Sequence, residues 1–326
     1  MGFWGLPVAQ YVVQSVLHGI VALVLTEASI QAWRVKDPFV RFRYRLATLI
    51  LPAMMQPAFQ LATPTRGDFY FRLRVALFDS RRWLELRSFD DVPLTGWLFA
   101  LLLLIAALVT LLQELRPALA REGTTPATPG APIPPELSLL VEELAQKMGV
   151  LRPTLGLVDL EVPIIVNAGV REPAIYLSRA LLTALTPREL RAAVCHELAH
   201  VRRRSNRTTL LVFFLRVWLF FNPVALLVFR RLVQDDEQIC DDIARHTLGD
   251  GHALAKALEK LLAAQLGDVD TTTTVRARIE EGGFRLLLRE RTERLRQPAA
   301  PGQVGHAWEG WLTCVGAILV LSYFIV

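Results

Sequence analysis

The sequence predicts a mainly α-helical membrane protein that carries a cytoplasmic α+β domain. Apolar residues make up 52% of the 326 residues and charged residues only 21%. Several apolar stretches approach the roughly 20 residues that cross a bilayer as a helix. A region with the helical and β-branched patterns of a globular domain lies before the last of these stretches.

The first apolar segment runs from Pro7 to Ala32 and contains no Lys or Arg. It lacks the basic start and the small-residue cleavage site of a secretory signal, so we expect a retained span. Gln10, Gln14 and His18 recur at i,i+4 spacing and share one helical face. Such a stripe either packs against neighbouring helices or marks a functional group in the membrane.

Two further spans, near 46–62 and 94–115, complete a predicted N-terminal membrane region over residues 1–115. The connection after the first span is basic, which places it in the cytoplasm by the positive-inside rule. The next connection, near 63–93, is then an external loop. Its six arginines run against the rule, which long loops follow less strictly.

The composition changes after the third span. Residues 116–135 hold six prolines among Gly, Thr and Ala, which is the composition of a linker. Residues 136–297 look globular, with short β-branched runs between 154 and 177 and helical patterns on both sides of them. A C-terminal span at 308–326 follows, so residues 116–307 are predicted to face the cytoplasm.

Charge and cysteine content exclude two classes of protein. The net charge is +5, but the arginines gather beside apolar segments and no nucleic-acid recognition motif occurs, so we expect no direct nucleic-acid partner. Three cysteines do not form a disulfide framework, which indicates a reducing compartment for the globular domain.

His196, Glu197 and His200 form the pattern H-E-x-x-H. Residues 186–189, Thr-Pro-Arg-Glu, precede it as a capping box with Pro at the first helical position. Two histidines at i and i+4 of a helix point to one side and can bind one zinc ion, while the Glu acts as general base toward a zinc-activated water. The alternative is an ordinary pair of surface histidines.

A zinc site needs a third protein ligand, and residues 201–234 contain no His, Asp or Glu. The acidic cluster 235–242 follows, and in it Glu237 and Asp241 share a face of a predicted helix. We assign Glu237 to the metal and Asp241 to a ligating histidine's second nitrogen. The alternative is a solvated acidic face. Cys195 and Cys240 neighbour the site, and we predict that both pack in the core.

Residues 208–232 are nearly all apolar and long enough to cross a membrane. A single crossing would leave the histidines and Glu237 on opposite sides. Because Pro223 interrupts a helix and restricts Asn222, we predict a broken or re-entrant helical hairpin that returns to the same face. A single buried helix of the globular domain is the alternative.

On these residues the chain resembles the BlaR/MecR-type membrane zinc metallopeptidases, gluzincins related to HtpX and the CAAX proteases. The similarity covers roughly residues 138–248. It is carried by Asn167-Ala168, "PAIYLSRALLTAL" (173–185), "TPRELRAAVCHELAHVRRR" (186–204), "FFNPVALLVFRRL" (220–232) and "DDEQICDD" (235–242).

The resemblance implies a zincin-like domain with one Zn²⁺ per chain, Glu197 as general base and Glu237 as third ligand. It also implies that a substrate strand pairs with an edge strand near 163–177, beside Asn167 and Ala168. The implied enzyme is a multi-pass endopeptidase of the bacterial inner membrane with a cytoplasmic active site. It cuts a protein or peptide substrate, such as a cytoplasmic repressor, in antirepressor-like signalling. Because the chain ends at Val326 after its last span, we expect no penicillin-binding sensor domain.

Two other functions stay open. A quality-control protease similar to HtpX would cut many proteins. A non-catalytic membrane receptor or scaffold would keep the fold but would need neither the general base nor a complete ligand set.

Overall fold

The computed structural model describes residues 7–85, 94–120, 132–169, 172–266, 275–297 and 307–326. This part of the chain is mostly helical and contains one small sheet. The chain divides into two units, which are described separately. Unit 1 comprises residues 1–122, 211–235 and 302–326, and unit 2 comprises residues 123–210 and 236–301.

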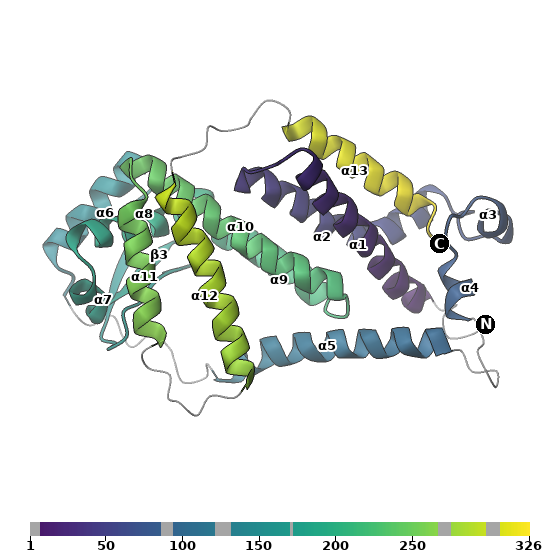
Figure 1. Ribbon diagram of the computed structural model, residues 1–326, viewed down its shortest axis with the longest axis horizontal. Helices are drawn as coiled ribbons and strands as arrows, with labels where there is room; N and C mark the ends of the chain where they lie inside the picture. The colour runs from purple at the N-terminus through teal and green to yellow at the C-terminus, as the bar shows by residue number, and fades with distance from the viewer. Residues whose placement is uncertain (1–6, 86–93, 121–131, 170–171, 267–274, 298–306) are drawn as a thin grey trace. The chain divides into compact units, whose positions relative to one another are not determined.

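In unit 1, helices α1 (Pro7–Ala32), α2 (Pro38–Ala62) and α13 (Ala307–Tyr323) pack against one another (Figure 1). Thr26 of α1 and Thr48 of α2 share a hydrogen bond of 2.7 Å between their hydroxyl oxygens. Both side chains are buried, so the bond satisfies two polar groups that have no access to water.

Helix α2 starts at Pro38, well before the span that the sequence predicted at 46–62. The signal for this earlier start is Asp37, whose carboxylate accepts hydrogen bonds from the N–H groups of Phe39 and Val40 at 2.7 and 3.4 Å. The basic segment therefore lies largely within a helix. Its Arg45 forms an ion pair of 2.6 Å with buried Asp235, which neutralises both charges.

The predicted external loop contains two short helices, α3 (Phe69–Arg74) and α4 (Ser80–Leu84). The chain between them pairs with the last residues of the sequence. The N–H of Leu77 donates to the carbonyl of Phe324 at 2.8 Å, and the N–H of Val326 donates to the carbonyl of Phe78 at 2.9 Å.

Helix α5 (Leu94–Ala120) continues past Arg116, where the sequence predicted the start of a linker. Pro117 lies in the last turn, and the three residues after it, Ala-Leu-Ala, have high helix propensity. In the described part of the chain, one helix, Pro7–Ala32, is long and apolar enough to cross a membrane. Thr95–Val109 and Trp308–Tyr323 are shorter apolar helices.

The apolar segment near 208–232 forms two helices, α9 (Ser205–Trp218) and α10 (Pro223–Leu248). Asn222 ends the turn between them, and its side-chain oxygen accepts a hydrogen bond of 2.9 Å from the N–H of Val224. The Arg216 guanidinium of α9 lies 4.4 Å from the centre of the Phe229 ring of α10. The chain therefore turns back near Asn222, and α9 contacts α10 beyond the turn, as in a helical hairpin.

Unit 2 contains a three-stranded sheet in the order β1-β3-β2. The parallel pair is β1 (Thr154–Val158) with β3 (Ala174–Ser178), and β2 (Ile165–Ala168) runs antiparallel to β3. Strand β2 is therefore an edge strand. The predicted edge near 163–177 was too broad, because β3 lies in the centre of the sheet with both sides paired.

In the described part of unit 2, the sheet is accompanied by residues 236–248 of α10 and by helices α6 (Pro135–Met148), α7 (Arg179–Ala184), α8 (Pro187–Arg203), α11 (His252–Leu266) and α12 (Val275–Arg296). Helix α8 packs against α6, α11 and β2, so it lies at the centre of the unit (Figure 1). Its Ala192, Val194 and Leu198 are fully buried in the apolar core. The motif helix is thus held in place by packing on several sides.

Candidate metal centre

Helix α8 begins with the capping box that the sequence indicated. The N–H of Thr186 donates to the Glu189 carboxylate at 2.9 Å, and the N–H of Glu189 donates to the Thr186 hydroxyl at 3.4 Å. Lys260 of α11 forms an ion pair of 2.6 Å with the same carboxylate. The helix ends at Arg204, which has the left-handed φ of 55°. Both ends of the helix that carries H-E-x-x-H are therefore defined by local structure.

Three ligand atoms from two helices converge. His196 Nε2 and His200 Nε2 of α8 lie 3.2 Å apart. Glu237 of α10 places one carboxylate oxygen 3.5 Å from His196 Nε2 and the other 3.6 Å from His200 Nε2. A tetrahedral zinc site with bonds of about 2.0–2.1 Å separates its ligand atoms by about 3.3–3.4 Å. The donor set and its spacing therefore fit one zinc ion.

Asp241 lies one helical turn beyond Glu237. Its Oδ1 is 3.0 Å from His196 Nδ1, the ring nitrogen that faces away from the other ligand atoms. The side chain is only 1% exposed, and its pKa is held far below the ordinary range because Arg291 and His196 outweigh the effect of burial. Asp241 is thus a permanent anion that orients His196, as a carboxylate does behind many metal-binding histidines.

Arg291 of α12 belongs to the same cluster, although no pattern in the sequence indicated a role for it. Its guanidinium donates two hydrogen bonds of 2.8 Å to Asp241 and lies 2.9 Å from Glu237 Oε2. It therefore holds the two carboxylates in fixed positions. The available signal was charge balance: the acidic cluster 235–242 requires cations, and the basic stretch 285–296 supplies them.

A second group of possible ligands uses the other nitrogen of His200. Cys240 Sγ lies 3.3 Å and Asp236 Oδ2 3.8 Å from His200 Nδ1. Burial keeps the pKa of the Cys240 thiol well above its ordinary value, so it stays neutral and acts as a hydrogen-bonding partner of His200. Asp236 is also engaged by Arg203 at 3.0 Å. Cys240 and Asp236 therefore contact His200 at Nδ1, the ring nitrogen opposite the one that faces Glu237, and hold the ring in place.

Cys195 has no such role. It is fully buried, and its sulfur contacts the Met148 sulfur at 3.8 Å, in agreement with the predicted core packing. Burial raises the pKa of its thiol to about 11.

Glu197 is 9% exposed and lies on α8 between the two histidines. Burial raises the pKa of its carboxyl group to about 7. A carboxylate with a pKa near neutrality can both accept and return a proton, which is the property that a general base in hydrolysis needs.

Asn167 and Ala168 lie at the end of the edge strand β2. The Asn167 side chain donates a hydrogen bond of 3.2 Å to the backbone carbonyl of Glu197, which links the strand to the motif helix. Asn167 and His200 line a common groove of about 330 Å³, which Arg202, Arg204 and Arg207 also line. The groove therefore extends from the edge strand β2 to His200 of the cluster.

The model of one protein family, described as BlaR1 peptidase M56, matches residues 95–268. The match covers more than half of the chain and includes His196, His200, Glu237 and Asp241. Arg291 lies beyond it. The chain belongs to the BlaR1 peptidase M56 family, a family of membrane-associated metallopeptidases.

Proposed function

We propose that this chain is a membrane-bound, zinc-dependent endopeptidase. His196, His200 and Glu237 would hold one Zn²⁺, and Glu197 would act as general base. The observation that supports this most directly is the convergence of three ligating side chains. The ring nitrogens of His196 and His200 lie 3.2 Å apart, and the two carboxylate oxygens of Glu237 lie 3.5 Å from the first and 3.6 Å from the second.

The chemistry divides between the ion and the side chains. A bound Zn²⁺ lowers the pKa of a coordinated water and polarises the scissile carbonyl. Glu197 takes the proton of the attacking water on its carboxylate and delivers it to the leaving amine. Asp241 and Arg291 keep His196 and Glu237 in position, so little reorganisation is needed during the reaction.

The substrate would bind as an extended strand along β2. Its backbone would pair with the outer edge of β2, and its scissile bond would lie in the groove beside His200. Three exposed arginines along the groove, Arg202, Arg204 and Arg207, favour a segment with acidic side chains.

We further propose the topology that the sequence predicts, with four spans near 7–32, 46–62, 94–115 and 308–326 in the bacterial inner membrane. The active site would then face the cytoplasm, and a cytoplasmic or membrane protein, such as a repressor, would be the substrate. The turn between α9 and α10 supports a site whose ligands all lie on one side of the membrane. His200 precedes α9 and Glu237 lies in the second half of α10, yet a carboxylate oxygen of Glu237 lies 3.6 Å from His200 Nε2.

Replacing the general base tests the proposal. Glu197→Gln in the full chain should lower cleavage by about 10²–10⁴-fold, the usual contribution of a general base, while zinc content stays at one per chain. Glu142→Gln makes the same chemical change on an exposed face of α6 and should cleave like wild type. Zinc is measured by elemental analysis, and cleavage by comparing membrane and cytosolic proteomes of the expressing cells.

The same comparison separates the alternatives. One protein cut at one site supports signalling, whereas many fragments support quality control similar to HtpX. Proteomes that are identical in wild-type and Glu197→Gln cells would leave only the receptor or scaffold.

A further inference from the structure

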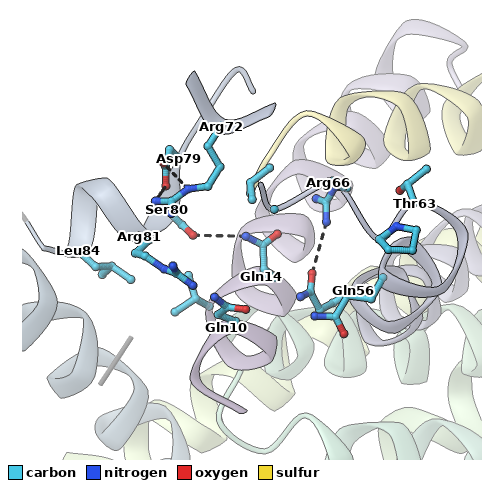
Figure 2. Close-up of a pocket in the computed structure, with 15 residues that line it drawn as sticks. Gln10, Gln14, Gln56, Thr63, Arg66, Arg72, Asp79, Ser80, Arg81 and Leu84 are labelled. Atoms are coloured by element: carbon cyan, nitrogen blue, oxygen red, sulfur yellow. Dashed lines mark hydrogen bonds and ion pairs between the residues drawn. The ribbon is translucent and has the colours of Figure 1, made fainter. Parts of the chain in front are cut away.

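Unit 1 contains a cavity of about 110 Å³ beside the N-terminal half of α1. Helices α1, α2 and α4 and the turn after α2 line it (Figure 2). We call it the glutamine cavity, because four of its lining residues are glutamines. The polar side chains used below are Gln10, Gln14, Gln56, Gln60, Arg66 and Arg81. None of the lining residues lies in the segment that the peptidase family model matches.

Gln14 has a polar atom that the protein does not satisfy. Its amide nitrogen donates to the Ser80 hydroxyl at 3.3 Å, but its oxygen has no hydrogen-bond partner among the described residues. The side chain is only 4% exposed. The side-chain amide of Gln14 can also be placed the other way round, with Ser80 donating to its oxygen. In the first orientation the oxygen is left as an acceptor without a partner, and in the second the nitrogen is left as a donor without a partner. A buried group of this kind normally has a partner.

Arg66 brings a positive charge that no carboxylate of the described chain neutralises. The side chain is 6% exposed, and Nε and Nη2 donate to backbone carbonyls of residues 322–325. Nη1 makes only one long contact, 3.5 Å to the Gln56 oxygen, which Figure 2 shows as a dashed line. Burial lowers the pKa of Arg66 to about 10, so it remains charged at neutral pH.

The cavity has more cations than anions. Asp79 and Arg72 neutralise each other through hydrogen bonds of 2.9 and 2.8 Å. Arg81 of α4 also lines the cavity, and in Figure 2 its side chain points toward Gln10 and Gln14 of α1. Three arginines, Arg66, Arg72 and Arg81, therefore outnumber the two carboxylates that line the cavity, those of Asp79 and of the last residue, Val326, and neither Arg66 nor Arg81 forms an ion pair in the described part of the chain.

We propose that the glutamine cavity binds a small oxyanion, a phosphate or carboxylate group, between Arg81, Gln14 and Nη1 of Arg66. An anion would supply the missing negative charge, and its oxygens would accept hydrogen bonds from both guanidinium groups and a glutamine amide. The volume is slightly below the about 150 Å³ of a cavity that holds benzene, which suits a group of a few heavy atoms. The site is a second ligand site, separate in sequence from the peptidase motif.

The oxyanion can come from a soluble ion or from a lipid headgroup. The test uses the full chain in nanodiscs of zwitterionic phosphatidylcholine, and it measures the thermal unfolding midpoint during titration with inorganic phosphate. Chloride at the same ionic strength controls for screening. A second set of nanodiscs contains the anionic lipid phosphatidylglycerol. A ligand that binds only the folded protein raises the midpoint.

We expect phosphate or the anionic lipid to raise the midpoint of wild type. Arg81→Gln should weaken this binding by about 10–100-fold, the effect of losing a charged hydrogen bond. Arg82→Gln removes the same charge from the neighbouring, exposed position that does not line the cavity, and should bind like wild type. Gln14→Met should weaken binding by about 2–10-fold.

The two sources give different results. A response to free phosphate identifies a soluble anion, and a response only in phosphatidylglycerol nanodiscs identifies a headgroup. The proposal is wrong if neither raises the wild-type midpoint. It is also wrong if Arg81→Gln and Arg82→Gln respond equally, because the effect would then be general charge attraction.

Discussion

The metal centre and the glutamine cavity both bury polar side chains, but they balance charge in opposite ways. At the metal centre, Glu197, Glu237 and Asp241 face a single guanidinium, that of Arg291. Among the described residues of the glutamine cavity, the three arginines Arg66, Arg72 and Arg81 outnumber the two carboxylates, those of Asp79 and of the last residue, Val326. Since buried charge is costly unless it is compensated, the first site favours a cation and the second an anion.

The two regions also differ in how completely their hydrogen bonds are made. Asp241 has partners on both oxygens, and Arg291 holds two carboxylates. Gln14 leaves one oxygen without a partner in the described chain. A prearranged metal site is thus held by hydrogen bonds and ion pairs to its ligands, whereas in the cavity the amide oxygen of Gln14 lacks a hydrogen-bond partner among the described residues. Four substitutions test this contrast.

The largest effect is expected from Glu237→Gln. The substitution removes the only anionic ligand, so zinc should be lost, and the several kcal/mol that a metal ion contributes corresponds to a loss of activity on the order of 10³-fold. Elemental analysis and a peptide-cleavage assay measure the two effects. Glu142→Gln is the matched control. Retention of a full zinc equivalent in Glu237→Gln would remove this residue from the ligand set.

Asp241→Asn should have the next largest effect, because it leaves Arg291 as a buried cation with a weakened partner. Breaking a buried ion pair typically costs about 3–5 kcal/mol of stability. Zinc affinity should fall by about 10–100-fold, since the second nitrogen of His196 loses its carboxylate. Chelator competition and thermal unfolding measure these effects. Unchanged zinc affinity would mean that Asp241 has a structural role alone.

Cys240→Ser distinguishes the two possible ligand groups around His200. If Cys240 only supports His200 Nδ1, the serine hydroxyl can replace it, and zinc affinity should change by less than about tenfold. If the ion were held by His200, Asp236 and Cys240, the variant would lose its zinc, because the thiolate would be a main ligand. Chelator competition against wild type decides between them.

Gln14→Met should have the smallest effect, and it should raise the stability of the protein, whereas the preceding substitutions lower stability or zinc affinity. It removes a buried oxygen without a hydrogen-bond partner, so in the absence of an anion we expect the unfolding free energy to rise by about 1 kcal/mol. Gln60→Met, at an exposed position lining the same cavity, should change stability little. A clear loss of stability in Gln14→Met would show that its contact with Ser80 matters more than the unmet bond.

Local patterns predicted the residues that lie together on one helix. The i,i+4 spacing of His196 and His200 places them on one face, and the capping box at 186–189 sets the start of that helix. The lack of His, Asp or Glu from 201 to 234 led directly to Glu237. Helix α2 starts earlier than predicted, at the local cap signal Asp37-Pro38, because the basic residues around this signal favoured a connection in the sequence.

Interactions between distant segments could not be predicted in the same way. Arg291 contacts Asp241 across 50 residues, and several arginines near it in the sequence are equally basic. Only packing of α12 selects one of them. The same holds for the cavity in unit 1. In the sequence, Gln14 is one member of a polar helical stripe and Arg66 is one of six arginines in the segment 63–93. Only the fold shows that both line one cavity.

By itself, the sequence determined the class of protein and the residue types of the metal centre, because helical periodicity and ligand chemistry act over a few residues. The tertiary structure alone decided how far apart the ligand atoms lie, which arginine supports them, and that unit 1 contains a cavity lined by more cations than anions. The physical reason is that burial and charge balance depend on contacts between distant segments, and sequence spacing carries no information about those contacts.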